Sequence, residues 1–427
     1  MGGKRALHIS RIENKYVIYK KLELNPTHDM KILAVNFGMS GFAGDSNQLF
    51  TITKNLISLG HEVTIVTTDA NVWKGDMEKS KQYSKIRGIL NNSIEKSIKI
   101  NNVPVIPLHC TIHEFGMYCP NAKAFAKKIV KDFDVVHIFN WYHHLGMTFA
   151  QVSYEEDVPF IISFYATLQE KGRQYKKFQK TIADSIYTKK LISKASALHS
   201  IGELETKDYI KWGANPEKIF RVDNVISLHD YKTTNQTNIF ERLKIQKEEG
   251  YIVFISRIHP KKGVDLLLKA FEKLLNSGLK TILVIAGTGS EEYQNEIKTL
   301  TENLGISNFV KFAGFVTNDE KLELLKHAKL YALTSHSDVH PTAIQDALAM
   351  GKPVLITKAC DYPEVEEYNA GMIVDSNIDS IFDGLEKMLN GSNLEQLSNN
   401  ASKLIQERFL VENLIKKYED MYISAIN

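Results

Sequence analysis

The residues best suited to chemistry lie in two loops in the second half of the chain. One loop reads Arg257-Ile-His-Pro-Lys-Lys-Gly263 and stands between an apolar run and a segment of helical period. Arg257 and Lys262 therefore present positive charge where a strand passes into a helix, and a diphosphate leaving group needs positive charge there. A solvated basic loop would have the same composition, so these residues alone favour neither interpretation.

The other loop carries two carboxylates eight positions apart. Asp338 follows a predicted strand, and Asp346 lies on a helix that Pro341 and Thr342 are expected to open. Amides of the first helical turn could hold a phosphate, and both carboxylates could accept hydrogen bonds from sugar hydroxyls. Taken singly, Asp338 could instead be a helix cap and Asp346 a surface residue.

The elements that must position these loops form two series. From Met30 onward, short apolar runs alternate with segments of helical period, a pattern typical of an α/β fold with parallel sheets. Strands are predicted at 31–37, 63–67, 103–108, 134–139, 159–164, 197–201, 251–256, 281–286, 309–312, 330–333 and 353–356. Ligands of such sheets bind at the carboxyl ends of the strands, which predicts a site in a cleft between two doubly wound, Rossmann-like domains.

A polar stretch marks the domain boundary. We assign residues 1–29 to an extension, 30–228 to the first domain, 229–249 to a linker and 250–405 to the second domain. Residues 406–427 are predicted to form a final helix that could return to the first domain.

These motifs resemble, in order, the donor-binding domain of glycosyltransferase family 4, which has the GT-B fold. The resemblance is carried by Ser-Arg257-x4-Lys262-Gly263, Ala-Gly287-Thr-Gly289, Phe312-Ala-Gly314, Asp338-x7-Asp346 and Gly351-Lys-Pro-Val. It runs from Met30 to the carboxyl terminus and includes Gly44 before a helix, the Gly60-His61 turn and Asp134-Val-Val-His137.

The resemblance implies a retaining glycosyltransferase that uses a nucleotide-diphosphate sugar as donor substrate and has no cofactor. Arg257 and Lys262 match the pair that neutralises the diphosphate, Asp338 the carboxylate that holds the sugar, and Asp346 the one that holds the ribose. Gly44 matches a glycine near the donor phosphates, and Gly287 and Gly289 match the turn near the nucleotide. Thr342 is expected to begin the helix that carries Asp346. The Asp-x-Asp spacing that binds metal in the other large glycosyltransferase fold occurs once, as Asp132-Phe133-Asp134. The family resemblance implies no catalytic metal, and none is expected.

Two departures from the family pattern concern catalysis. The family has glutamates where this chain has Asp338 and Asp346, and each aspartate is shorter by one methylene. Tyr165 stands where the family often has a histidine. We take Asp338, Tyr165 and His137 as catalytic candidates, although for His137 the sequence favours a structural residue of its strand.

Charge and composition restrict the possible partners. Lysines and arginines number 53 and acidic residues 50, a net charge of +3 that does not indicate a nucleic-acid partner. Three scattered cysteines and the lack of an apolar run of about 20 residues favour a cytoplasmic protein. Segment 171–190 has seven basic residues and the single acid Asp184, interleaved with apolar residues such as Ile182 and Ile186. It could rest on anionic lipid and reach a lipid-linked acceptor, or turn its apolar face into the core.

The sequence leaves two functions open. The first is transfer of a sugar to a hydroxyl acceptor. The second is a non-catalytic GT-B protein that binds nucleotide sugar or serves as a partner subunit. Donor hydrolysis in the presence of a panel of nucleotide sugars would distinguish them.

Overall fold

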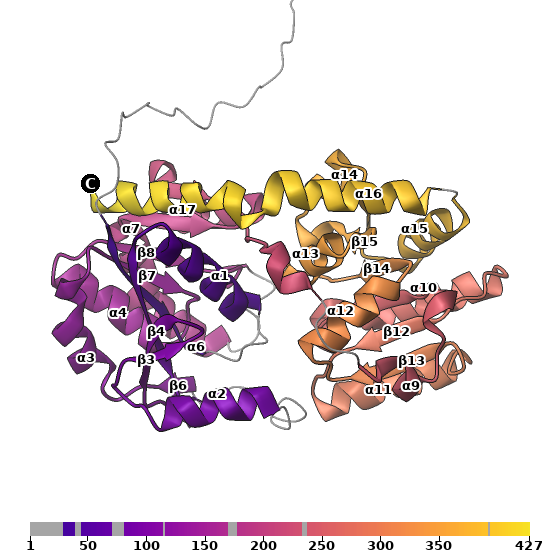
Figure 1. The fold of residues 1–427 in the computed structure, drawn as a ribbon, viewed down its shortest axis with the longest axis horizontal. Helices are drawn as coiled ribbons and strands as arrows, with labels where there is room; N and C mark the ends of the chain where they lie inside the picture. Colours follow the sequence, from indigo (N-terminus) through magenta and orange to yellow (C-terminus); the bar gives the residue numbers. More distant parts are fainter. Residues whose placement is uncertain are drawn as a thin grey trace, which may run out of the picture.

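The computed structural model describes residues 29–38, 44–70, 81–113, 116–169, 177–232, 237–391 and 393–427. Two α/β domains lie side by side, and each is built on a mainly parallel sheet (Figure 1). The predicted fold class is confirmed. Residues 1–28, which include nearly all of the predicted extension, lie outside the described part of the chain.

The first domain contains an eight-stranded sheet. Its strands follow the order β10-β9-β8-β7-β1-β2-β4-β3, and only the pair β3–β4 is antiparallel. The strands are β1 (Lys31–Asn36), β2 (Glu62–Thr68), β3 (Ile98–Ile100), β4 (Val103–Leu108), β7 (Val135–Phe139), β8 (Phe160–Ser163), β9 (Ala197–Ser200) and β10 (Ile219–Arg221). The runs of apolar residues in these strands reflect a sheet that is covered on both faces.

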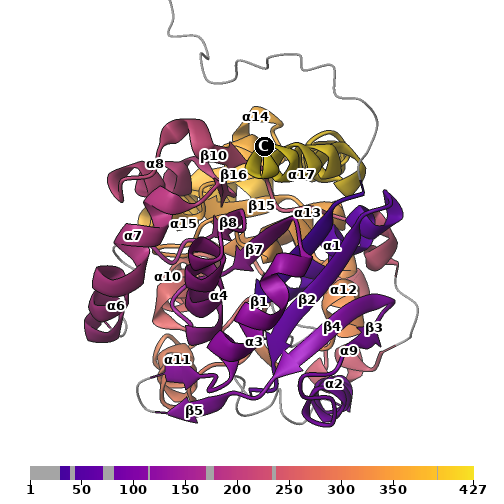
Figure 2. The ribbon, with the colours of Figure 1, turned by 90° about the vertical axis from the view of Figure 1, so that its left-hand side faces the viewer.

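Helices cover the two faces of the first sheet. Helices α1 (Gly44–Ser58) and α4 (His144–Glu155) lie on opposite sides of β1 (Figure 2). The remaining helices of this domain are α2 (Lys81–Asn91), α3 (Ala122–Ile129), α6 (Lys177–Ala183), α7 (Lys189–Lys194) and α8 (Glu203–Lys211). A short hairpin of β5 (Thr111–His113) and β6 (Gly116–Tyr118) follows β4.

The second domain contains a six-stranded parallel sheet in the order β13-β12-β11-β14-β15-β16. The strands are β11 (Ile252–Ile255), β12 (Leu283–Ala286), β13 (Val310–Gly314), β14 (Leu330–Leu333), β15 (Val354–Thr357) and β16 (Gly371–Val374). The helices are α9 (Ile239–Leu243), α10 (Val264–Asn276), α11 (Glu291–Asn303), α12 (Asn318–His327), α13 (Thr342–Ala349), α14 (Glu364–Glu367), α15 (Ile378–Asn390) and α16 (Leu394–Leu404).

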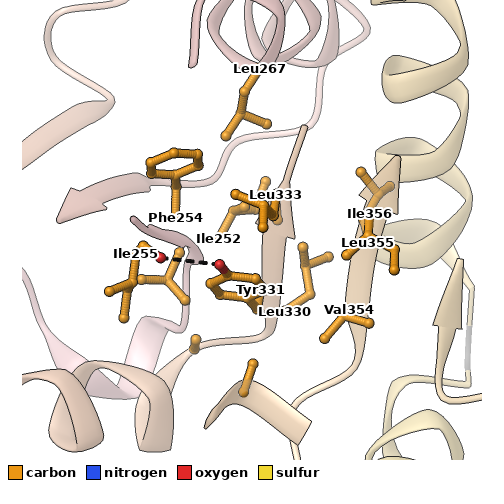
Figure 3. Close-up of a cluster of buried hydrophobic side chains, with 14 of the residues drawn as sticks. Ile252, Phe254, Ile255, Leu267, Leu330, Tyr331, Leu333, Val354, Leu355 and Ile356 are labelled. Carbon is orange, nitrogen blue, oxygen red and sulfur yellow. Dashed lines mark hydrogen bonds between the residues drawn. The ribbon is translucent and has the colours of Figure 1, made fainter. Parts of the chain in front are cut away.

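The core of the second domain fixes the end of β11 against β14. Tyr331 is fully buried among aliphatic side chains, and its hydroxyl donates to the carbonyl of Ile255 at 3.1 Å (Figure 3). A buried hydroxyl needs such a partner. Because Ile255 is the last residue of β11, this bond also positions the loop that carries Arg257.

The carboxyl-terminal segment connects the two domains. Helix α16 lies on the second domain, and α17 (Val411–Ile426) crosses to the first (Figure 1). Leu414, Tyr418 and Met421 of α17 are buried in the same cluster as residues of α1 and β1. An isolated parallel β-bridge between Ile226 and Leu410 adds a second contact at the boundary between the domains.

All eleven predicted strands are present, with ends shifted by at most two residues. The prediction missed β3, β10, β16 and the β5–β6 hairpin, which are short. It also treated 229–249 as a connector, whereas α9 lies within that stretch and Ile239 and Leu243 are buried in the second core. Residues from 237 onward therefore pack with the second domain, because two apolar side chains anchor an otherwise polar segment.

Candidate functional site

The loop after β11 and the loop after β14 are packed tightly together. Gly263 has φ +65°, and a Cβ there would lie 2.0 Å from the Thr334 carbonyl oxygen. The Thr334 hydroxyl donates to the Gly263 carbonyl at 2.7 Å, and the His336 amide donates to the Lys261 carbonyl at 2.9 Å. Only glycine fits this approach without strain, so the glycine holds the two loops in contact.

Lys262 and Asp338 meet across these loops. The Lys262 ammonium donates to Asp338 Oδ2, and the Ser335 hydroxyl lies 3.5 Å from the same oxygen. Lys262 is 8% exposed, and its partner's side chain is 16% exposed. Asp338 does not cap α13, since Pro341 occupies the N-cap position and no side chain bonds there. The capping alternative for Asp338 is thus wrong.

The basic residues of the first loop form one electropositive cluster. Arg257 is exposed and Lys261 is half-buried. Burial lowers the pKa of Lys261, and the charges of Lys262 and Arg257 lower it further, whereas Asp338 raises it. Burial and the same cations also lower the pKa of His259. Such mutual repulsion marks a place where an anion would be stabilising, and Lys261 is a member that the sequence motif did not single out.

Gly287 and Gly289 keep the loop after β12 close to the loop after β11. Added Cβ atoms would lie 1.8 Å from the carbonyl oxygens of Ser256 and Ile258 respectively. The Ile258 amide donates to the Thr288 carbonyl at 2.8 Å. These glycines therefore have a packing role that is sufficient to explain them.

Asp346 lies in a different environment from Asp338. Its Oδ1 accepts a hydrogen bond from the Tyr231 hydroxyl at 2.5 Å, and its Oδ2 accepts from the Lys321 ammonium at 2.7 Å. Thr342 is the first residue of α13 and is half-buried. Sequence reasoning missed Tyr231 and Lys321, which lie in the linker and on α12, because no local pattern connects them to Asp346.

His137 does not reach the site. It is fully buried on β7, where its Nδ1 lies 2.8 Å from the Tyr422 hydroxyl and its Nε2 lies 2.7 Å from the Ser163 hydroxyl. Burial and the neighbouring His199 lower its pKa well below the usual value. Both ring nitrogens are used inside the fold, so we correct the catalytic assignment of His137 to a structural one.

Tyr165 lies in the loop after β8, and this loop reaches the second domain. Its ring stacks with Phe139 at 6.2 Å. Four residues later, Gln169 Oε1 accepts a hydrogen bond from the Ser337 hydroxyl at 3.0 Å, next to Asp338. The carboxyl ends of β8 and β14 thus face each other, as the predicted placement of ligands between the domains requires. Gly44 begins α1, and the residues just before it lie outside the described part of the chain.

A second contact between the domains was also missed. The Gln345 amide group donates to the Asn224 carbonyl at 2.9 Å, and the Asn224 amide group donates to the His340 carbonyl at 3.3 Å. All three residues are buried. They connect α13 directly to the end of the first domain.

The loops at the carboxyl ends of the strands contain most of the unusual backbone near the site. Asn140, Tyr142, Tyr165, Ala166 and His340 all have φ between 45° and 67°. Non-glycine residues in this region cluster at functional sites, where the surrounding structure supports the strain. The described residues include no group of three or more His, Cys, Asp or Glu side chains arranged to hold a metal ion, and none of the described helices is long and apolar enough to cross a membrane.

Each half of the chain matches a family model. Residues 43–230 match the family described as Glycosyltransferase Family 4, and residues 235–404 match Glycosyl transferases group 1. Together these models take in most of the chain.

Relatives and solved structures agree with this. An uncharacterized glycosyltransferase of Methanocaldococcus jannaschii is 24% identical over 397 residues, which make up 88% of this chain and 93% of the relative. Alpha-monoglucosyldiacylglycerol synthase of Streptococcus pneumoniae is 28% identical over 203 residues, 46% of this chain and 44% of that protein.

Among solved structures, the crystal structure of Anabaena HepE in complex with UDP and glucose is similar to this fold. The TM-score is 0.69 at 18% sequence identity, over 92% of this chain and 100% of that one. The chain belongs to the glycosyltransferases of the GT-B fold, with a family 4 amino-terminal domain and a group 1 carboxyl-terminal domain.

Proposed function

We propose that this protein transfers a sugar from a nucleotide-diphosphate sugar to a hydroxyl acceptor with retention of the anomeric configuration. The observation that carries the proposal is the contact of Lys262 with Asp338 at the carboxyl ends of β11 and β14. An ammonium and a carboxylate side by side suit a diphosphate and a sugar hydroxyl bound next to each other. The UDP and glucose in the similar Anabaena structure are in keeping with such a donor.

Each site residue has a role in this proposal. Arg257 and Lys262 bind the diphosphate, and the amides at the start of α13, from Thr342, add hydrogen-bond donors as negative charge develops. Asp338 accepts from the sugar, while Asp346, held by Lys321 and Tyr231, accepts from the ribose. Gly287 and Gly289 keep the loop after β12 close to the loop after β11, which leaves room for the nucleotide beside them. Gly44, at the start of α1, is assigned to the donor phosphates because it matches the family glycine.

Retention follows from attack on the same face of the sugar. The acceptor oxygen bonds to the anomeric carbon as the bond to the diphosphate breaks, and the departing phosphate oxygen takes the acceptor proton. Asp338 is engaged by Lys262, which supports a sugar-orienting carboxylate in preference to a nucleophile. A phenol is a poor base at neutral pH, so Tyr165 is not expected to take the acceptor proton. Its hydroxyl is buried and its ring packs against Phe139 and His199, so the expected contact of this hydroxyl with sugar or acceptor would need a change of conformation.

The test is slow donor hydrolysis with a panel of nucleotide sugars, followed by nucleotide release. Asp338→Asn should lower hydrolysis of the preferred donor at least tenfold, because an amide keeps the shape but loses the charge. Asp265→Asn, at a position on α10 whose side chain is 33% exposed, is the matched control and should be unchanged. A chelator should have no effect, since Arg257 and Lys262 supply the positive charge. Binding without hydrolysis in the parent chain would favour the non-catalytic alternative.

We also propose that α6, α7 and the π-helical turn between them rest on an anionic membrane and bring the protein to a lipid-linked acceptor. Ile182 and Ile186 are 45% and 55% exposed. Lys189, Lys190 and Lys194 are exposed near them, while Asp184 is buried. Apolar side chains beside lysines suit an interface with anionic lipid. The synthase of a glucosylated diacylglycerol among the relatives is in keeping with a lipid acceptor.

A further inference from the structure

The loop after β8 has a backbone that requires external support. Tyr165 and Ala166 have φ angles of 50° and 60°. Residues with a Cβ seldom occupy this left-handed region, and two in succession are rarer still. Within the loop, the Thr167 hydroxyl donates to the Phe164 carbonyl at 2.7 Å, which closes the turn but does not hold it in place.

Helix α8 holds this loop through two side chains. The Phe164 amide donates to the Tyr209 hydroxyl at 3.1 Å, and the Ala166 amide donates to Glu205 Oε1 at 2.7 Å. The second oxygen of Glu205, Oε2, accepts from the Ile201 amide at 2.9 Å. Glu205 is 1% exposed. One buried carboxylate therefore joins the loops at the carboxyl ends of β8 and β9.

The other side of the same loop contacts the second domain. Gln169 accepts a hydrogen bond from Ser337, the residue before Asp338. The start of α8 contacts that domain as well, since the Leu204 amide donates to Asp361 Oδ2 at 3.1 Å. Glu205 thus lies directly behind the loop that meets the candidate donor site.

We infer that Glu205 is a positioning residue whose carboxylate holds the Tyr165–Ala166 turn in the conformation that presents Gln169 to the Asp338 loop. Glu205 itself does not touch the reacting atoms. The kinetic consequence of this inference rests on the proposed function, whereas its structural part does not.

The charge of Glu205 matters because both of its oxygens act as acceptors. A protonated carboxyl turns one oxygen into a donor that faces an amide. Burial raises the pKa of Glu205 to about 7, against the lowering effect of the Ala166 and Ile201 amides and of Tyr209, and Asp208 on the same helix raises it further. Tyr165, on the loop, lies close enough to Tyr209 to raise the pKa of the Tyr209 hydroxyl. His199 on β9 is buried with its pKa lowered to about 4 and is neutral in this range. At pH 8 the carboxylate is therefore mostly ionised, and both of its oxygens can accept.

The test compares Glu205→Gln with Glu203→Gln in the full chain. Glu203 lies on the same helix but is exposed and pairs with Lys207 at 2.6 Å. Without any substrate at pH 8, amide hydrogen exchange in 164–169 should be about tenfold faster in Glu205→Gln and unchanged in Glu203→Gln. Exchange equal to the parent in both variants would overturn the inference. Glu205→Asp, which keeps the charge on a shorter side chain, should restore part of the protection and guards against a variant that fails to fold.

Kinetics give an independent reading. With a nucleotide sugar, kcat should fall about tenfold in Glu205→Gln while KM for the donor is retained, because Arg257 and Lys262 are untouched. A kcat equal to that of the parent in Glu205→Gln would overturn the inference. If no nucleotide sugar reacts with the parent, the proposed function fails, and hydrogen exchange still decides the role of Glu205.

Discussion

Lys262 and Asp338 are 76 residues apart in the sequence and share a hydrogen bond in the structure. Both lie in short loops after parallel strands, and the tight packing of Gly263 on Thr334 brings those loops together. The pair is mostly shielded from water, where removing one partner leaves a costly unpaired charge. This shielding makes Lys262 the most informative single residue to change.

Lys262→Ala should weaken binding of a nucleoside diphosphate such as UDP by about 1.5–3 kcal/mol, the range for hydrogen bonds to charged groups. Calorimetric titration measures this directly. Lys269→Ala, on the exposed face of α10 and 4.0 Å from Asp265, is the matched control. An affinity equal to that of the parent, in a variant that unfolds cooperatively, would contradict the assignment of Lys262 to the diphosphate.

Glu205 also predicts how stability depends on pH. Because its pKa rises from 4.5 to about 7 on folding, the folded state binds the proton more tightly than the unfolded state between those values. Stability from this group is therefore gained as the pH falls from 8 to 5, by roughly 2–3 kcal/mol. The free energy of unfolding of the parent minus that of Glu205→Gln should rise by this amount across the range. A constant difference would show that the carboxyl does not titrate in this window.

At the scale of elements, the segment from Lys177 to Lys194 buries a different face from the one that its apolar spacing predicted. The apolar spacing predicted that Ile182 and Ile186 could enter the core, yet both are exposed and Asp184 and Thr188 are buried instead. The reason is hydrogen bonding: Tyr142 donates to Asp184 at 2.7 Å, and the Trp141 indole donates to Thr188 at 2.7 Å. A π-helical turn over Asp184–Thr188 accompanies this orientation.

Exposed isoleucines beside lysines should give measurable membrane binding. Sedimentation with vesicles of phosphatidylglycerol and phosphatidylcholine should bring down the parent chain. The double variant Ile182→Ser, Ile186→Ser should bind at least tenfold more weakly, since burying each side chain contributes about 1.5–3 kcal/mol. Ile210→Ser, at a 46% exposed position on α8, should bind like the parent. Equal binding of all three proteins would remove this surface from the proposal.

At the scale of the molecule, α17 connects the end of the second domain to the core of the first. Tyr422 bonds His137 Nδ1, His137 bonds Ser163, Ser163 bonds His199 at 2.7 Å, and His199 bonds the Val222 carbonyl at 2.8 Å. This buried series of hydrogen bonds runs across β7, β8 and β9. It explains how a polar side chain at His137 is accommodated in the core. It stabilises the fold and reaches none of the donor-site residues.

Tyr422→Phe should lower the free energy of unfolding by about 1–3 kcal/mol, because His137 Nδ1 loses its partner in a buried setting. Donor hydrolysis, measured well below the unfolding temperature, should stay within twofold of the parent. Tyr154→Phe, at a 36% exposed site on α4, should change neither. A large loss of turnover in Tyr422→Phe without a loss of stability would return His137 to the catalytic set.

The sequence by itself determined the architecture and one side of the site. Alternation of apolar runs with helical segments predicted every long strand, because burial on both faces imposes a local pattern that a single chain displays. The basic residues between Arg257 and Gly263 identified the candidate anion-binding loop for the same reason, since the charges, the glycine and the end of a strand are adjacent in sequence. The three-residue strands β3 and β10 and the five-residue helix α9 escaped, as so few residues carry too little periodicity.

Only the tertiary structure decided how these parts are connected. Asp346 acquired Lys321 and Tyr231 as partners, His137 was placed in the core, Ile182 turned outward, and Glu205 came to lie behind Tyr165. Each outcome depends on contacts between residues far apart in the chain, 285 positions apart for His137 and Tyr422. Such contacts follow from how buried polar groups find partners once the domains are assembled, and no local pattern of residues records that.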